Sequence, residues 1–181
     1  MTMSNNAQQP WEMAAGEIAA VLSRVEHEQF AAVLSVFSDT SRRWFFSGQG
    51  RSGLVARMVA MRAMHIGRQA HVLGEATCPA ITPDDGMVFF SGSGETPVTI
   101  HFAEIAHAVG ATVVAVTHAP HSRIVELADC ALIVPVQRSS QLPGNLSEQC
   151  SLVLMDSLLT TAASALEDPA ATLFRQHTNM Q

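Results

Sequence analysis

Short apolar segments alternate with helix-like segments along most of the chain, and this alternation constrains the fold more than any other feature. The predicted strands lie at 44–47, 70–73, 87–90, 112–116 and 131–134. The helices expected between or after them lie at 52–66, 97–109, 121–128 (with Ser122 as a possible cap), 146–166 and 169–177. Uninterrupted apolar strands are typical of a parallel sheet that is covered on both faces. With right-handed crossovers, the pattern predicts a three-layer α/β/α sandwich around a five-stranded parallel sheet.

The length of 181 residues suits one domain with a sizeable core, and we expect a single domain over 1–181. Its parts are an N-terminal helical region at 11–37, sheet and helices over 43–166, and a C-terminal helix and tail at 169–181. Only 14% of the residues are charged, whereas 48% are hydrophobic. Because a lone domain usually carries more charge on its surface, we expect other copies of the chain to cover part of it.

The charge pattern and the cysteines narrow the possible partners and the compartment. The net charge is −6 and no basic run is present, which argues against nucleic acid as a partner. We expect no membrane association, because the N-terminus lacks a signal-peptide pattern and no window reaches the roughly 20 apolar residues of a membrane span. Three cysteines without metal-type spacing are read as reduced thiols, which predicts a cytoplasmic protein.

A loop of small hydroxyl residues and glycines, SGSGET at 91–96, lies between a predicted strand and a predicted helix. Such a loop points backbone N–H groups outward, and the helix adds the positive end of its dipole. Ser91, Ser93 and Thr96 add neutral hydroxyl donors. The nucleotide-binding pattern GxxxxGK[ST] is absent, so a single phosphate group is the simplest ligand. The alternative is an ordinary turn, in which Gly and Ser are common.

A second loop, GQGRSG at 48–53, matches the GxGxxG pattern between a strand and a helix. Glu75 follows at the end of the next strand, about 20 residues later, as a dinucleotide-binding fingerprint requires. NAD is therefore a competing ligand. We prefer the phosphate hypothesis, because the hydroxyl loop suits a terminal phosphate. The chain is also short for a dinucleotide domain plus a catalytic domain.

Taken together, several segments resemble the sugar isomerase (SIS) domain family and, within it, the 6-phospho-3-hexuloisomerases. They are GQGRSGLVARMVAMRAMHIG (48–67), GEATCPAI (74–81), SGSGET (91–96), GATVVAVT (110–117), LADCALIVPV (127–136), LPGNLSEQCSLVLMDSLL (142–159) and the C-terminal HTNMQ. The resemblance implies an SIS-type sandwich, related to flavodoxin-like and Rossmann-like folds. It also implies interconversion of 3-hexulose 6-phosphate and fructose 6-phosphate without cofactor or metal. A homo-oligomer, either a tetramer or a dimer, with sites at subunit boundaries would carry out this reaction.

Carried onto this sequence, the resemblance assigns a role to ten residues. Those expected to bind the substrate or its phosphate are Ser52, Ser91, Ser93, Thr96, Gly50, Arg51, Glu75 and His177. Those expected to be catalytic are Glu148, as the base, and His65. A carboxylate suits the removal of a proton beside a carbonyl, which gives an enediolate, and a histidine can move oxygen-bound protons.

Each of these roles has a plainer alternative. Glu148 can be a residue that stabilises a helix start, and Glu75 can cap a turn. His65 lies on a helix rich in Met and Ala, so it can be a core or subunit-contact histidine, and His177 lies near a tail that normally frays. His118 and a second histidine at 121 have a spacing that can bind a metal, but no further ligands with suitable spacing accompany them.

The sequence also departs from the pattern it resembles. Gln49 replaces a usual Ala, Ser147 replaces a common Phe, HAPH at 118–121 replaces a turn like Ser-Asn-Pro-Asp, and Gln181 replaces a terminal carboxylate. These changes bear on the choice of sugar more than on the fold. Two other functions stay open. One is a different aldose–ketose sugar-phosphate isomerase, and the other is a non-catalytic SIS regulator that senses a sugar phosphate.

Overall fold

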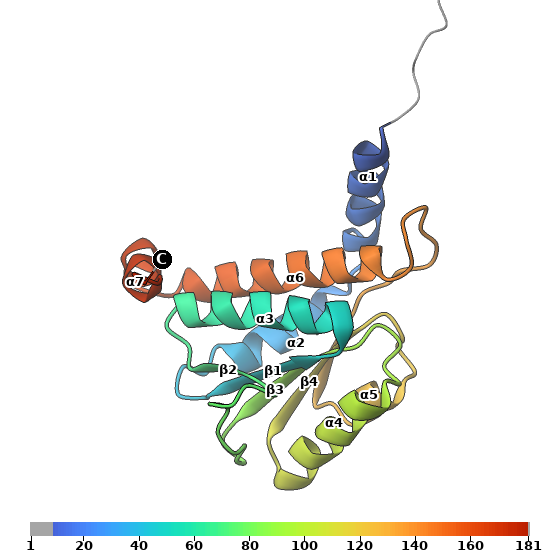
Figure 1. The fold of residues 1–181 in the computed structure, drawn as a ribbon. Coiled ribbons are helices and arrows are strands. Elements are labelled where there is room, and N and C mark those ends of the chain that lie inside the picture. Colours follow the sequence, from blue (N-terminus) through green and yellow to red (C-terminus); the bar gives the residue numbers. More distant parts are fainter. Residues whose placement is uncertain (1–8, 181) are drawn as a thin grey trace, which may run out of the picture.

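The computed structural model describes residues 9–180, so Gln181 lies outside it, and it confirms the predicted three-layer α/β/α architecture (Figure 1). Five parallel strands form one sheet in the order β2-β1-β3-β4-β5. The strands are β1 Trp44–Gly48, β2 Ala70–Val72, β3 Gly86–Phe90, β4 Thr112–Thr117 and β5 Cys130–Ile133. The helices are α1 Pro10–Leu22, α2 His27–Phe37, α3 Gly50–His65, α4 Pro97–Val109, α5 Arg123–Glu126, α6 Asn145–Ala163 and α7 Pro169–Gln176. All five strands therefore lie where the alternation of the sequence predicts them.

The central strands are largely apolar because both of their faces are buried. Phe46 and Val88 contribute to the core beneath α2, α3 and α6, whereas Phe45, Met87 and Phe89 contribute to the core on the side of α4 and α5. Successive side chains along a strand point to opposite faces, which separates the two cores. Most residues of the central strands are therefore apolar, with Ser47 and Thr117 as buried polar residues near the strand ends, and the usual alternation of polar and apolar residues disappears.

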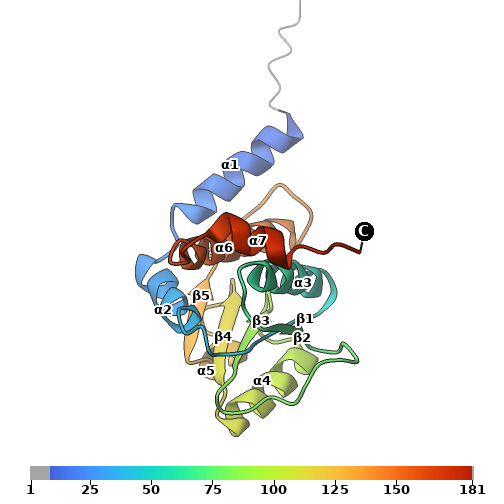
Figure 2. The ribbon, with the colours of Figure 1, turned by 90° about the vertical axis from the view of Figure 1, so that its left-hand side faces the viewer.

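Helices α3 and α6 run side by side across one face of the sheet and begin at the same end of the molecule (Figure 1). Helix α1 projects away from the sandwich near the start of α6, and α7 lies at the opposite end, across the last turns of α3 and α6 (Figures 1 and 2). The first turns of α3 and α6 are therefore neighbours at the edge of the sheet where the strands end.

The helix boundaries differ from the predictions mainly at α5. The predicted helix at 121–128 is a single turn, Arg123–Glu126. Ser122 occupies the cap position, but its hydroxyl donates to the carbonyl of Ala119 at 2.7 Å and does not cap the helix. Within residues 9–180, no helix is long and apolar enough to cross a bilayer.

Candidate functional site

The two glycine-rich loops lie next to each other, because they follow neighbouring parallel strands. β1 pairs with β3 in a register that sets Gly48 beside Phe90, the last residues of the two strands. The loop at 48–53 leads into α3, and the loop at 91–96 leads into α4. Ligands of open α/β sheets bind outside the carboxyl ends of the strands, so this edge is the expected place for a site.

The glycines of the first loop bring the backbone of β1 against the first turn of α3. A Cβ atom on Gly48 would lie 2.7 Å from the carbonyl carbon of Ser52, and one on Gly53 would lie 2.7 Å from the carbonyl oxygen of Gly48. No real side chain tolerates such distances from backbone atoms. The GxGxxG spacing therefore has a packing reason in this chain, independent of any dinucleotide.

The second loop presents hydroxyl groups at the start of α4. Ser91 Oγ lies 3.4 Å from Thr96 Oγ1, and Ser93 Oγ accepts a hydrogen bond from the N–H of Glu95 at 3.2 Å. Thr96 stands at the cap position of α4, yet its hydroxyl makes no capping hydrogen bond. Hydroxyls, backbone N–H groups and the positive end of a helix dipole therefore face the same region, as anion binding requires.

Glu148 and Arg51 form an ion pair where α3 and α6 begin. Arg51 Nε donates to Glu148 Oε2 at 2.5 Å. The Glu148 side chain is only 15% exposed, whereas that of Arg51 is 63% exposed. Arg51 therefore fixes the direction of the carboxylate, which is largely shielded from solvent while one side stays open to the neighbouring pocket.

A small open pocket is lined by residues of both loops and by Glu148. Its lining residues are Ser52, Val55, Phe90, Ser91, Gly92, Val116, Thr117, His118, Ser147, Glu148 and Ser151. Three of the predicted site residues, Ser52, Ser91 and Glu148, thus line one pocket. The sequence analysis gives His118 and Ser147 no catalytic or binding role, although both are among the departures that bear on the choice of sugar. The position of His118 directly after a central strand was the signal that points to this edge.

His65 and His177 lie together, but at the other end of α3. Their rings stack with centroids 5.2 Å apart and an interplanar angle of 13°. His65 is buried at 6% exposure, and its Nδ1 has no hydrogen-bond partner among residues 9–180. Burial, and then the positive charges of Arg62 and His177, hold the pKa of His65 below its ordinary value of 6.5. At 1.5 Å per residue, α3 separates His65 from Gly50 by about 22 Å.

Glu75 and Gly50 lie outside the pocket at Glu148. Glu75 is exposed after the edge strand β2, beside a surface depression that Arg57 and Met61 also line. Gly50 is exposed in the first turn of α3 with a φ of +55°, a conformation that favours glycine. Among residues 9–180, no three His, Cys, Asp or Glu side chains group closely enough to hold a metal ion.

A five-stranded parallel sandwich with two glycine-rich loops at the carboxyl edge of its sheet is the architecture expected of a sugar isomerase domain. The sequence matches the SIS domain family over residues 39–162, and the chain belongs to that family. This confirms the resemblance stated from the sequence.

Within the family, the chain is similar to proteins named as hexulose-phosphate isomerases. It is 37% identical over 173 residues to the 3-hexulose-6-phosphate isomerase of Mycobacterium gastri, an alignment that covers 91% of this chain and 86% of the relative. A Methanococcus jannaschii protein, whose structure was taken to infer the same molecular function, has a TM-score of 0.83 at 24% identity, over 94% of this chain and 98% of that one. The Vibrio vulnificus NanR protein, complexed with ManNAc-6P, has a TM-score of 0.77 at 19% identity, over 91% of this chain and 65% of that one.

Proposed function

We propose that this protein is a sugar-phosphate isomerase that interconverts 3-hexulose 6-phosphate and fructose 6-phosphate. The observation that carries the proposal is that Ser52, Ser91 and Glu148 line one pocket. The similarity to the Mycobacterium gastri enzyme selects this reaction among those of aldose–ketose isomerases. The structurally similar NanR protein, complexed with ManNAc-6P, is consistent with a ligand of the sugar-phosphate class.

In this proposal, the loop at 91–96 binds the phosphate group. The hydroxyls of Ser91, Ser93 and Thr96 donate to phosphate oxygens, and the start of α4 adds its positive dipole end. Ser52 adds a hydroxyl from the first turn of α3, where Gly50 and Arg51 lie beside the sugar. Fixing the phosphate holds the reacting carbons near Glu148, and such positioning is a large part of what an isomerase contributes to rate.

Glu148 acts as the base in the proposed mechanism. Its carboxylate removes the proton from the carbon next to the substrate carbonyl, and the electron pair moves to form an enediolate. The same proton returns to the neighbouring carbon while the oxygen-bound protons exchange, which moves the carbonyl between C3 and C2. The two sugars have the same overall oxidation state, so the reaction needs no redox cofactor, and the proposal gives no step to a metal.

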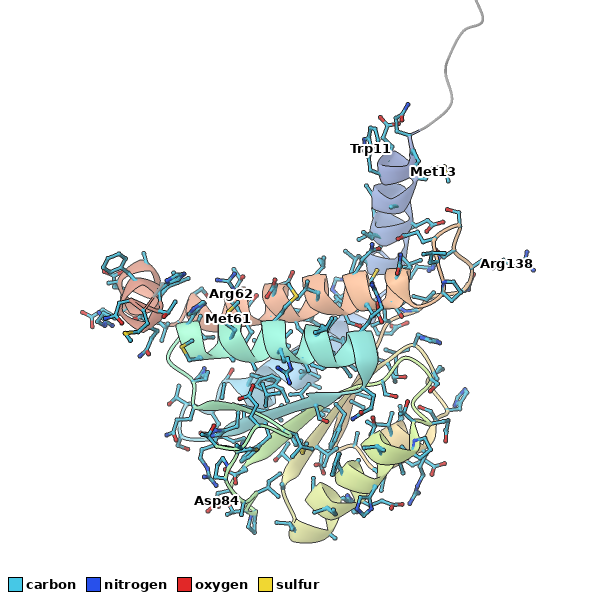
Figure 3. All side chains as sticks on the ribbon, in the orientation of Figure 1. Trp11, Met13, Met61, Arg62, Asp84 and Arg138 are labelled. Carbon is cyan, nitrogen blue, oxygen red and sulfur yellow. The ribbon has the colours of Figure 1, made fainter. Side chains whose placement is uncertain are left out.

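The proposal includes a homo-oligomer, in which His65 and His177 belong to a site formed with another subunit. One chain holds them at the far end of α3 from Glu148, so they can meet the carboxylate only across a subunit boundary. Leu54, Met58 and Met61 form an exposed apolar stripe on α3, at helical spacing, and Met61 is labelled in Figure 3. A second copy of the chain, as a dimer or within a tetramer, is the partner that such a stripe fits.

The test is a coupled assay with 3-hexulose 6-phosphate and fructose 6-phosphate, run with and without a chelator on the wild type and on Glu148→Gln. We expect wild-type turnover that survives the chelator. Glu148→Gln should lower kcat by about 10²- to 10⁴-fold, because the base is removed while the shape is kept.

Glu28→Gln is the matched control, because Glu28 also lies in the first turn of a helix but on α2, away from the site. It should keep wild-type kcat. If Glu148→Gln retained full turnover, Glu148 would not be the base. A wild type that binds fructose 6-phosphate without converting either sugar would instead support a sugar-phosphate regulator.

A further inference from the structure

His118 follows β4 directly and lines the same pocket as Glu148. Its main chain is tied to the loop at 91–96, because the N–H of His118 donates to the carbonyl of Gly92 at 3.3 Å. Thr117 Oγ1 donates to the same carbonyl at 2.9 Å. The backbone around His118 is therefore held by contacts that do not use the imidazole, and the side chain is exposed.

The imidazole and the Ser147 hydroxyl face one small space beside Gly92. The position where Gly92 lacks a Cβ lies 3.3 Å from His118 Nδ1 and 4.0 Å from Ser147 Oγ. Ser147 is buried and donates its own proton to the carbonyl of Gly144 at 2.9 Å, so its oxygen can still accept a hydrogen bond. Two of the positions that depart from the usual sequence pattern, His118 and Ser147, thus meet at one point of the pocket.

This space lies between the two groups that the proposed reaction needs. Gly92 belongs to the loop that offers Ser91 and Ser93, and Ser147 directly precedes Glu148. Ser91, Gly92 and Glu148 line the same pocket, so a ligand bound in it lies near the space beside Gly92. An imidazole there can either donate a hydrogen bond to a hydroxyl or accept one from it. Within the part of the chain that the structure describes, the imidazole makes no hydrogen bond, so its polar atoms are available to a ligand.

We propose that His118 is a specificity-determining residue that forms a hydrogen bond with a sugar hydroxyl of the bound substrate, in the space beside Gly92 that it shares with Ser147. This inference rests on the function proposed above, and it adds a residue for the sugar rather than for the phosphate. Gly92 is needed for this arrangement, because a Cβ at position 92 would occupy the space and contact the imidazole closely.

The first experiment measures kcat and KM for fructose 6-phosphate in His118→Ala and His118→Gln. We expect His118→Ala to raise KM about three- to tenfold with a smaller change in kcat, as the loss of one hydrogen bond predicts. His118→Gln keeps a donor and an acceptor and should recover part of the loss. His121→Ala, an exposed histidine in the same loop, is the control and should match the wild type. Equal KM values in all four proteins would overturn the proposal.

Inorganic phosphate separates contact with the sugar from contact with the phosphate group. Its inhibition constant should be the same in the wild type and in His118→Ala, because the proposed hydrogen bond goes to a hydroxyl. If His118→Ala raised the KM for fructose 6-phosphate and the inhibition constant of inorganic phosphate by the same factor, His118 would be a phosphate ligand and the proposal would be wrong. If the wild type shows no turnover, the proposed function fails by itself. The same variants are then compared by titration with fructose 6-phosphate, where a Kd raised in His118→Ala alone supports the role of His118 and equal Kd values overturn it.

A double-mutant cycle tests whether Ser147 shares the space. A phenyl ring in Ser147→Phe would fill the region beside Gly92 and separate the imidazole from the substrate. In that background, His118→Ala should change kcat/KM by less than about twofold, so the two effects are not additive. Additive effects would show that the two side chains do not share one space.

Discussion

The two ends of α3 offer opposite kinds of chemistry. At its start, Arg51 and Glu148 form an ion pair at the mouth of a pocket lined with hydroxyls. At its end, His65 and His177 stack, and burial lowers the pKa of His65. The first arrangement keeps charge at the surface, where an anionic substrate can reach it. The second disfavours the charged form of a buried histidine, because burial and the nearby Arg62 and His177 lower the pKa of His65. Acid–base groups are thus divided between two places in a single chain.

Mixing two inactive variants tests whether the two ends of α3 serve one site. Glu148→Gln removes the group at the start of α3, and His65→Asn removes the one at its end. Each alone should lose about a hundredfold or more in kcat if both groups serve one site. After subunit exchange, a site that combines Glu148 of one subunit with His65 of another should restore roughly a quarter of wild-type activity in a random dimer. The coupled assay measures the recovery.

The control is each variant taken alone through the same subunit-exchange procedure, after which it should stay inactive. Absence of recovery in the mixed sample, with exchange verified by mass spectrometry, would show that Glu148 and His65 do not complete one site across a subunit boundary, and it would remove His65 from the proposed reaction. A His65→Asn protein with wild-type kcat would make the end of α3 a structural contact only.

Phosphate binding should depend on the loops near the start of α3 and not on the histidines at its end. Ser93 is exposed in the loop at 91–96, so Ser93→Trp should fold normally while its bulk blocks the phosphate. We expect the Kd for fructose 6-phosphate to rise by about tenfold or more, measured by titration calorimetry. Ser35→Trp, on the exposed side of α2, is the matched control. Unchanged affinity in Ser93→Trp would contradict the assignment of the loop.

The smallest expected effect concerns pH and the other end of α3. Burial, with Arg62 and His177 nearby, lowers the pKa of His65 from 6.5 in the folded protein. As pH falls, the unfolded chain therefore binds a proton at His65 before the folded protein does. This residue makes no difference to stability well above pH 6.5, and it destabilises the fold as the pH drops through and below that value.

Thermal unfolding between about pH 5 and pH 8 measures this effect. His65→Asn should give a shallower fall of Tm on the acid side than the wild type, by a few degrees at most. His101→Asn, on the exposed side of α4, is the control and should keep the wild-type slope. Identical slopes in all three proteins would mean that the protonation of His65 does not contribute to stability.

The sequence predicted the fold well because the fold depends on local patterns. Apolar runs such as 87–90 and 112–116 specify strands, and the glycines at 48 and 53 specify a tight strand-to-helix turn; the structure confirms both. The sequence also predicted that the loops at 48–53 and 91–96 lie at the same edge of the sheet, because the carboxyl ends of parallel strands meet there. These inferences need only periodicity and the rules of sheet connection.

The site was less predictable, because it depends on which side chains meet in space. Nothing in the spacing of His118 and Ser147 reveals that both face Gly92, since one follows a strand and the other begins a helix 29 positions later. His65 lies on the same helix as Ser52, yet the length of α3 carries it to the opposite end. Glu75 fits the expected interval but lies after an edge strand, outside the pocket. Assignment of these residues needs their tertiary neighbours, which spacing along the sequence does not give.

The close contact between Gly48 and Gly53 has a thermodynamic consequence for ligand binding. Because β1 and α3 meet backbone to backbone, neither can move closer to the other without a clash, and a shift apart would lose this close packing. The loop between them is thus already ordered before any ligand arrives. A ligand that contacts Ser52 meets a preorganised surface, and its binding loses little conformational entropy of the chain. The conformational entropy of this loop is lost when the protein folds and not when a ligand binds. The affinity for a ligand therefore depends on the contacts it makes with the loop.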